Sequence, residues 1–408
     1  MTRPGSREAW AVFSKGRIGG LNLANRFVRS ATWDPHMAAA RVVDRATLDA
    51  YRALAEGGVG LIIVGDFGVV PESGTVRGAA AYDDIRVRKF SALAGVVHAA
   101  NPSARVVAQV SAGFWGAGPS RVASLIDGHA PRRLLRREVR SLASRFAVAI
   151  KGARDDGFDG VQLHAAHGGL LCRFLSPRTN RRDDEYGGSP EGRCRLFREI
   201  LSAARDRVGD FPILIKMNGT DEVPDGIDVA TLKTQAAILA EAGFDALEVS
   251  GAMRDTLAVP ESVLGFRPVP APESRVGIMA RERQSYYLSH AQAVRKAVDV
   301  PVILVGGNRD VERIEEIVSS GWADFVAMCR PLIREPNLVS RWRSGKGSSE
   351  AACIACNACI YDMHTSRRPG RVRCVALEQP GRLADAIRWR DEWVGANVAP
   401  RAEWEKRP

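Results

Sequence analysis

GFDGVQLHAAHG, residues 157–168, contains the repeating unit of this chain: a glycine turn, a short apolar run, and polar side chains where that run ends. Eight runs rich in Val, Ile and Leu occur along the sequence, each followed by a longer amphipathic stretch. The runs, which we expect to be strands, are Phe27–Ala31, Gly60–Val64, Arg105–Val110, Gly160–His164, Pro212–Met217, Ala246–Val249, Val300–Val305 and Asp324–Met328. The expected helices include Thr47–Glu56, Arg86–Ala99, Arg140–Asp155, Glu191–Val208, Val229–Glu241, Gln284–Ala297 and Asp310–Ser319.

Strands this apolar, without alternation, suit a parallel sheet covered on both faces. Strand–helix alternation eight times over predicts a (β/α)8 TIM barrel with a C-terminal cysteine-containing module and extension. A doubly wound sheet is the competing fold, but no strand is followed by the G-x-G-x-x-G fingerprint of a dinucleotide-binding unit. We therefore divide the 408 residues into a barrel over 1–345 and a cysteine module with a tail, packed on the barrel, over 346–408.

The composition is that of an ordinary soluble globular protein, and neither a nucleic-acid partner nor a membrane segment is expected. Lys and Arg exceed Asp and Glu by 58 to 47, a net charge of +11. The arginine clusters are scattered and carry few interleaved aromatics, so we expect no nucleic-acid partner. No apolar run reaches ~18 residues and the N-terminus has no signal-like stretch, so we expect a cytoplasmic protein without a membrane anchor. We also expect a small-molecule substrate and a homo-oligomer.

Polar residues stand where nearly every predicted strand ends, which is where barrels carry their chemistry. After the seventh strand, Gly306, Gly307 and Asn308 open a helix, and Arg330 ends the eighth. Free amides at a helix start together with a neighbouring guanidinium predict a site for one monophosphate. Gln109 and Lys216 can then hydrogen-bond the edge of a planar heterocycle attached to that phosphate.

His164 and His167 place two imidazoles three residues apart at the end of the fourth strand. A metal site requires a third protein ligand, and none is evident in the sequence. Two neutral donors that grip a substrate carbonyl oxygen, and so make its β-carbon electrophilic, are favoured. A purely structural pair of capping histidines remains an alternative.

Several motifs resemble the old yellow enzyme family. They run from about Phe13 to Cys374, and the long stretch from His164 to Ser189 is the most specific. The motifs are GGVGLI (57–62), GFDGV (157–161), HAAHG (164–168), FLSP (174–177), NRR (180–182), DEYGGS (184–189), EVSG (248–251) and RPLI (330–333).

The resemblance implies an FMN-containing barrel in which NADH or NADPH reduces the flavin and the flavin passes hydride to an activated alkene. Residues matching the family's motifs take its roles. Those facing the flavin ring are Gln109 and Lys216, those facing the phosphate are Gly307, Asn308, Cys329 and Arg330, those binding the substrate oxygen are His164 and His167, and those giving mainly backbone contacts are Ala31, Thr32 and Asp66.

Three positions depart from the family pattern. Many members carry a proton-donating tyrosine two residues after the histidine pair, where this chain has Gly169. Trp33 stands where Thr or Cys is common under the flavin edge, and the third strand's end, QVSAG (109–113), lacks a His that many members have. Flavin binding is little affected by these changes, but ordinary alkene reduction is put in question.

Cys353, Cys356, Cys359 and Cys374 follow the spacing C-x2-C-x2-C-x14-C. Three thiolates close in sequence and a distant fourth suit iron-sulfur or zinc. The segment resembles the branch of the family containing trimethylamine dehydrogenase and 2,4-dienoyl-CoA reductase, in which a 4Fe-4S cluster lies near the FMN. We expect such a cluster first, zinc second and free thiols third, with no further nucleotide-binding domains after the module.

The function we predict is an FMN-dependent oxidoreductase that transfers hydride between a nicotinamide and a small organic substrate. One alternative is a dehydrogenase or demethylase that oxidises an amine and releases electrons through the cluster to a partner protein. A second is a Schiff-base aldolase, since Lys216 ends a barrel strand and a desolvated lysine there can attack a carbonyl. A non-catalytic flavin-binding or nucleic-acid-binding protein is the third.

Overall fold

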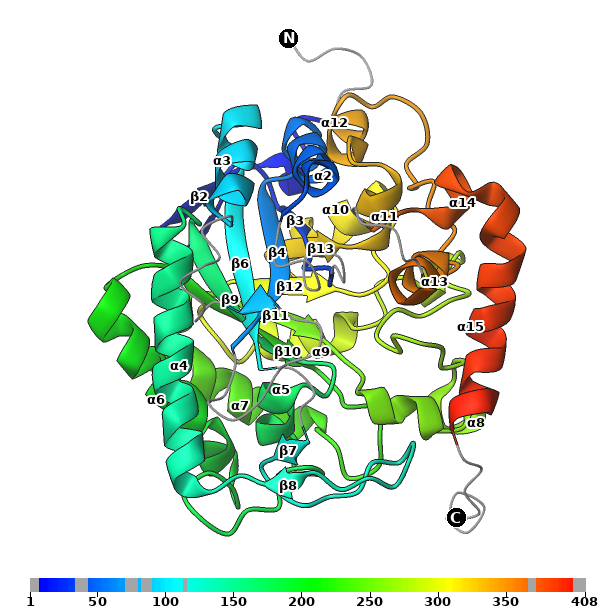
Figure 1. Cartoon of the computed structure of the whole chain (residues 1–408). Helices are drawn as coiled ribbons and strands as arrows, with labels where there is room; N and C mark the ends of the chain where they lie inside the picture. Colours follow the sequence, from blue (N-terminus) through cyan, green and yellow to red (C-terminus); the bar gives the residue numbers. More distant parts are fainter. Residues whose placement is uncertain are drawn as a thin grey trace.

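The computed structural model describes residues 7–33, 43–69, 80–81, 90–112, 116–365 and 372–398; the side chains of residues 66, 80, 81, 364 and 365 lie outside that description. Eight parallel strands occupy the centre of the molecule with helices around them (Figure 1). In chain order they are β3 (Phe27–Arg29), β4 (Leu61–Gly68), β6 (Arg105–Ser111), β9 (Gly160–Ala165), β10 (Ile213–Asn218), β11 (Leu247–Ser250), β12 (Val302–Val305) and β13 (Phe325–Met328).

Pairing between the first and second barrel strands closes the sheet. The strand order β3-β13-β12-β11-β10-β9-β6-β4 returns to its start because β3 also pairs with β4, through Val28 opposite Leu61 and Arg29 opposite Ile62. A doubly wound sheet has two open edges, so this pairing excludes it. The fold is a (β/α)8 TIM barrel, as the eight apolar runs predicted.

The outer helices bury their apolar faces against the strands. They are α2 (Arg45–Glu56), α3 (Ser91–Ala100), α4 (Arg136–Asp155), α6 (Pro190–Val208), α7 (Val229–Ala242), α9 (Leu288–Arg295) and α10 (Val311–Ser319). The third expected helix, Arg140–Asp155, begins four residues earlier than the pattern indicated, at Arg136, because the Glu138 carboxylate accepts a hydrogen bond from the Leu135 backbone N–H and caps the helix. Residues 86–89 of the expected second helix lie outside the described residues.

Short elements at the barrel's periphery escaped the sequence pattern. A hairpin of β1 (Gly16–Ile18) and β2 (Leu21–Leu23) precedes the barrel, and α5 (Leu170–Leu175) follows the histidine motif. The remaining ones are β5 (Ala80–Ala81), β7 (Ala117–Gly118), β8 (Arg132–Arg133), α8 (Glu261–Leu264), α11 (Arg330–Arg334) and α12 (Leu338–Arg343). None of the helices that the structure describes is both long and apolar enough to cross a membrane.

The C-terminal segment packs beside the barrel through α13 (Ala358–Thr365), α14 (Val375–Glu378) and α15 (Leu383–Asn397), of which α15 runs along one side of the molecule (Figure 1). Ala358, Val375 and Ala386 form a small apolar cluster of its own. Buried Arg309, next to the start of α10, donates hydrogen bonds to the carbonyl oxygens of Ala351 and Cys353 at 2.9 and 3.2 Å. Side chains of the barrel therefore hold the backbone of the cysteine segment.

Candidate active site

A cavity of about 1390 Å³ lies at the C-terminal ends of the barrel strands. Residues at or just beyond the ends of β3, β6, β9, β10, β11, β12 and β13 line it. Of the residues predicted to bind cofactor or substrate, it brings together Ala31, Thr32, Gln109, His164, His167, Lys216, Gly307, Asn308, Cys329 and Arg330. Asp66, which was also predicted to contact the cofactor, lies in β4, and its side chain is outside the described part of the structure.

Lys216 and Gln109 belong to a buried network of polar side chains inside the barrel, and both line the cavity. Lys216 Nζ donates to Ser30 Oγ at 2.7 Å and lies 3.2 Å from the Glu248 carboxylate, which is wholly buried. Gln109 Nε2 donates to Gln162 Oε1, and Gln162 Nε2 donates to Glu248 Oε2, both at 2.7 Å. One carboxylate thus fixes, directly or through a neighbour, both side chains expected to bind the heterocycle edge.

The two histidines lie side by side, with ring centroids 5.1 Å apart and ring planes at 68°. His167 has φ +59°, and its backbone N–H donates to Asn218 Oδ1 at 3.1 Å, which holds the turn that follows β9. Its Nε2 is 2.7 Å from Ser250 Oγ. Burial, then the charges of His164 and Lys216, lower the pKa of His167 well below its ordinary range. A neutral imidazole at this position suits hydrogen bonding to a substrate oxygen.

The loop after β12 has the backbone of an anion cradle. Gly306 and Gly307 have φ of +114° and +78°, and a Cβ on either would come within 2.7 Å of a tyrosine ring, so glycine is required at both. Arg330 begins α11 and is buried beside this loop. The Asn308 side chain bonds Leu304 O, Ala327 O and Ser285 Oγ, so its part is to join β12 to β13.

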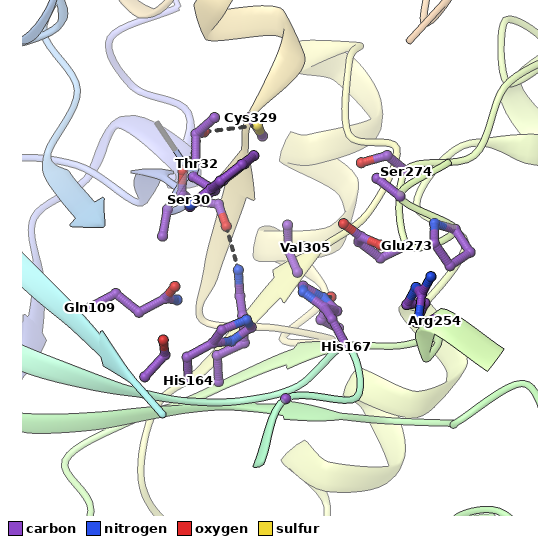
Figure 2. A pocket seen from close by; sticks show the side chains of 18 of the residues that line it. Ser30, Thr32, Gln109, His164, His167, Arg254, Glu273, Ser274, Val305 and Cys329 are labelled. Atoms are coloured by element: carbon purple, nitrogen blue, oxygen red, sulfur yellow. Dashed lines mark hydrogen bonds between the residues drawn. The ribbon is translucent and has the colours of Figure 1, made fainter. Parts of the chain in front are cut away.

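Thr32 and Cys329 meet at the cavity wall, where Thr32 Oγ1 and Cys329 Sγ are 3.0 Å apart (Figure 2). Thr32 also forms an isolated bridge with Gly65. Ala31 is half-buried in the same wall.

None of the four C-terminal cysteines, all of which the structure describes, forms a disulfide, and of the four Cys353 lines the cavity. Burial raises the pKa of Cys353, Arg330 opposes this, and Cys356 and Cys374 lie close enough to raise it further. Burial raises the pKa of Cys359 as well, with Cys329, Cys353 and Cys356 adding to the rise. Within the described residues, no three or more His, Cys, Asp or Glu side chains are grouped closely enough to hold a metal ion.

Sequence reasoning missed several cavity residues. Glu273 lies on the long segment between β11 and α9, a region without strand periodicity, and Arg309 follows the glycine loop. Trp389 and Trp393 of α15 also line the cavity. Their contribution depends on how α15 packs, which no local pattern records.

Comparison with known proteins agrees with this geometry. Residues 12–348 match the model of the NADH:flavin oxidoreductase / NADH oxidase family, and the chain belongs to that family. This confirms the resemblance to the old yellow enzymes that the motifs indicated.

Among curated relatives, a metal reductase of Desulforamulus reducens is 30% identical over 92% of this chain and 54% of its own length. An NADH oxidase of Thermoanaerobacter brockii is 34% identical over 86% and 53%. The chain therefore spans about half the length of these two relatives. The NADH-dependent flavin oxidoreductase iliE of Hypocrea jecorina is 33% identical over 78% of this chain and 85% of its own.

Two solved structures share the fold. A 2-naphthoyl-CoA reductase complex superposes with a TM-score of 0.78 at 22% identity, covering 92% of this chain and 58% of that one. Morphinone reductase in complex with tetrahydroNAD superposes with a TM-score of 0.63 at 21% identity, covering 84% and 96%. At these identities the likeness establishes the fold alone.

Proposed function

We propose that this protein is an FMN-dependent oxidoreductase that takes hydride from NADH or NADPH and passes it to an activated alkene in a small organic substrate. The observation that carries the proposal is that one cavity unites a glycine–arginine cradle, a paired lysine and glutamine, and two adjacent histidines. Relatives named NADH oxidase and NADH-dependent flavin oxidoreductase support it.

The residues present fit FMN. The cradle of Gly306, Gly307 and Arg330 offers backbone amides and a guanidinium, the donors that a monophosphate requires. Lys216 and Gln109 supply donors for the edge of the ring system. The cavity of about 1390 Å³ exceeds the roughly 300 to 1,000 Å³ typical of single small-ligand sites, which leaves room for a substrate beside the cofactor.

FMN, when bound, supplies the hydride-carrying group. The Lys216 ammonium stabilises negative charge on the pyrimidine edge of the flavin. The ion pair with the Glu248 carboxylate holds that ammonium in position. His164 and His167 donate hydrogen bonds to the carbonyl oxygen of the substrate, and this draws electrons from the β-carbon. A lysine held in an ion pair is a poor nucleophile, so the same contact argues against the Schiff-base aldolase.

Anaerobic half-reactions test the proposal. NADH or NADPH is expected to bleach the oxidised flavin absorption of the FMN-loaded protein, and an enone such as cyclohexenone to restore it. His164→Ala combined with His167→Ala is expected to leave flavin content and nicotinamide reduction intact and to slow reoxidation by about 10² to 10³ for each lost donor. Reduction by candidate amines, but by neither nicotinamide, would instead establish the amine dehydrogenase.

For residues 346–408 we propose a module in which Cys353, Cys356, Cys359 and Cys374 bind one metal centre, iron-sulfur before zinc. The C-x2-C-x2-C-x14-C spacing of these four cysteines supports the proposal. Anaerobically purified protein is then expected to contain about four iron and four sulfide per chain. A Cys356→Ser variant is expected to lose them, with Cys194→Ser, on α6, as the control. Neither iron nor zinc above trace would leave these residues as plain thiols.

A further inference from the structure

The proposed reaction needs a proton that Gly169 cannot supply. Hydride addition to the β-carbon leaves an enolate-like anion, whose α-carbon must be protonated, and a positioned acid is worth about 10² to 10⁴ in rate. Gly169 lines the cavity as the residue before α5, and the nearest atom to a Cβ built there is Ala166 O at 3.7 Å. Among the described residues nothing fills the space beside Gly169, and glycine has no side chain that could donate a proton.

Only two carboxylates occur among the described side chains that line the cavity, Glu138 and Glu273. Arg132 donates two hydrogen bonds to Glu138, at 2.8 and 2.9 Å. Together with the Leu135 N–H, these hydrogen bonds hold the pKa of Glu138 below its usual range, so it stays ionised. His167, with its lowered pKa, carries no spare proton at neutral pH. Glu273 is the remaining carboxyl group.

Three successive carbonyl oxygens pin the backbone that carries Glu273. Tyr286 Oη donates to Glu273 O at 2.7 Å, Asn357 Nδ2 donates to Ser274 O, and Arg330 Nη1 donates to Arg275 O at 2.9 Å. The Arg275 side chain is itself stacked 4.5 Å over the Tyr286 ring. The three donors lie just before α9, at the start of α11 and in the cysteine module. They converge on three residues of an otherwise irregular segment, as expected for a positioned functional group.

The Glu273 side chain points from this pinned segment into the cavity, toward Val305 and His167 (Figure 2). Burial raises the pKa of its carboxyl above the ordinary range, and the charges of Lys216 and Arg330 only partly oppose this. The group thus keeps its proton to a higher pH than a solvated glutamate. A neutral carboxyl group beside a developing anion is what general-acid catalysis requires.

We propose that Glu273 is the general acid that takes the place of the missing tyrosine, an inference that rests on the proposed function. Hydride from the reduced cofactor reaches the β-carbon and the alkene π-bond breaks. The electron pair it releases forms a new C–H bond at the α-carbon with the proton from Glu273. The carboxylate left behind regains a proton from solvent, and NADH or NADPH restores the hydride.

Stopped-flow half-reactions of the FMN-loaded Glu273→Gln variant test this role. Reduction by the nicotinamide is expected to stay within about twofold of wild type, while reoxidation by cyclohexenone slows by about 10² to 10⁴. Glu282→Gln, in the short turn Arg281–Arg283 and exposed, is the matched control and is expected to react as wild type. Reoxidation of Glu273→Gln at the wild-type rate would overturn the assignment.

A rescue separates lost chemistry from lost structure. Adding Gly169→Tyr to Glu273→Gln restores a donor at the family's position, so reoxidation is expected to recover at least tenfold. No recovery, with flavin content normal, would contradict a proton-donor role for Glu273.

An infrared measurement tests the proton itself and does not depend on turnover. At neutral pH the band of a protonated carboxyl group is expected in wild type and Glu282→Gln and to be weaker in Glu273→Gln; identical spectra would overturn the proposal. Wild-type protein that no enone reoxidises would instead count against the proposed function.

Discussion

At the residue scale, the side chains expected to bind the cofactor depend on partners that the sequence does not mark. Gln109 and Lys216 were predictable because each ends an apolar run. Glu248 was quoted only as part of a family motif, yet it accepts hydrogen bonds from Gln162 and Ser30 at 2.7 Å, from strands far away in sequence. Closure of the barrel brings these residues together, so no local pattern could reveal the network.

The Lys216–Glu248 pair gives a prediction about stability. Both groups are buried, so Lys216→Met leaves an unpaired carboxylate inside the barrel and is expected to lower the free energy of unfolding by about 3 to 5 kcal/mol. Adding Glu248→Gln removes that charge and is expected to recover most of the loss. Urea denaturation of the two single variants and the double variant measures the coupling. Strictly additive effects would show that the pair does not act as a unit.

At the element scale, the second part of the most family-specific stretch, residues 180–189, has a structural role. Arg182 is buried, bonds both oxygens of Asp184 at 2.8 and 2.6 Å, and donates to Pro119 O and Leu134 O. It therefore ties the segment before α6 to the loops around β7 and β8. Asn180 adds bonds to Phe174 O and Tyr186 O. The motif was recognisable in the sequence, but its structural role was not, because its side chains donate to backbone carbonyl oxygens of other segments.

The pH dependence of this clamp is predictable. Burial acts to raise the pKa of Asp184, but hydrogen bonds from Arg182 and the Tyr186 N–H outweigh it and lower the pKa from 3.8 to about 2. Because the folded pKa lies below the unfolded one, the ion pair stabilises the fold above pH ~4 and is lost as pH falls toward 2. Asp184→Asn is expected to cost roughly 2 to 3 kcal/mol at pH 7.

Chemical denaturation at pH 7, 4 and 3 measures this effect, and the gap between wild type and Asp184→Asn is expected to narrow as the pH falls. Asp183→Asn is the control, since the Asp183 side chain is 84% exposed and pairs only with Arg133 at the surface. That change is expected to leave the free energy of unfolding close to that of wild type at all three pH values. A gap that stays constant with pH would contradict the lowered pKa of Asp184.

At the scale of the whole molecule, the barrel was predictable and the docking of the C-terminal segment was not. The apolar runs identified every barrel strand because parallel strands are buried on both faces. The contact of Asn357 with Ser274 and the approach of α15 to the cavity depend on irregular segments without periodicity. The positions of Trp389 and Glu273 in the cavity wall were therefore not predictable from the sequence.

The tryptophans of α15 give a prediction at this scale. Trp389 lines the cavity and meets the Tyr361 ring at 5.5 Å between centroids. Trp389→Ala removes apolar surface from the cavity wall, and if the substrate contacts this surface, KM for a bulky enone is expected to rise about tenfold, roughly 1.4 kcal/mol, with kcat little changed. Leu377→Ala, exposed on α14, is the control. Unchanged steady-state kinetics in Trp389→Ala would place the substrate elsewhere.

The most direct test of the central claim, that this cavity is an FMN site with its phosphate at the glycine–arginine cradle, is FMN affinity measured by titration of the apoprotein. Wild type is expected to bind one FMN per chain, and Arg330→Ala to lose roughly 2 to 4 kcal/mol of affinity, a factor of about 30 to 900. The control Arg198→Ala, exposed on α6 and away from the cavity, is expected to bind as wild type. An apoprotein that does not bind FMN, or an Arg330→Ala variant with unchanged affinity, would contradict the account.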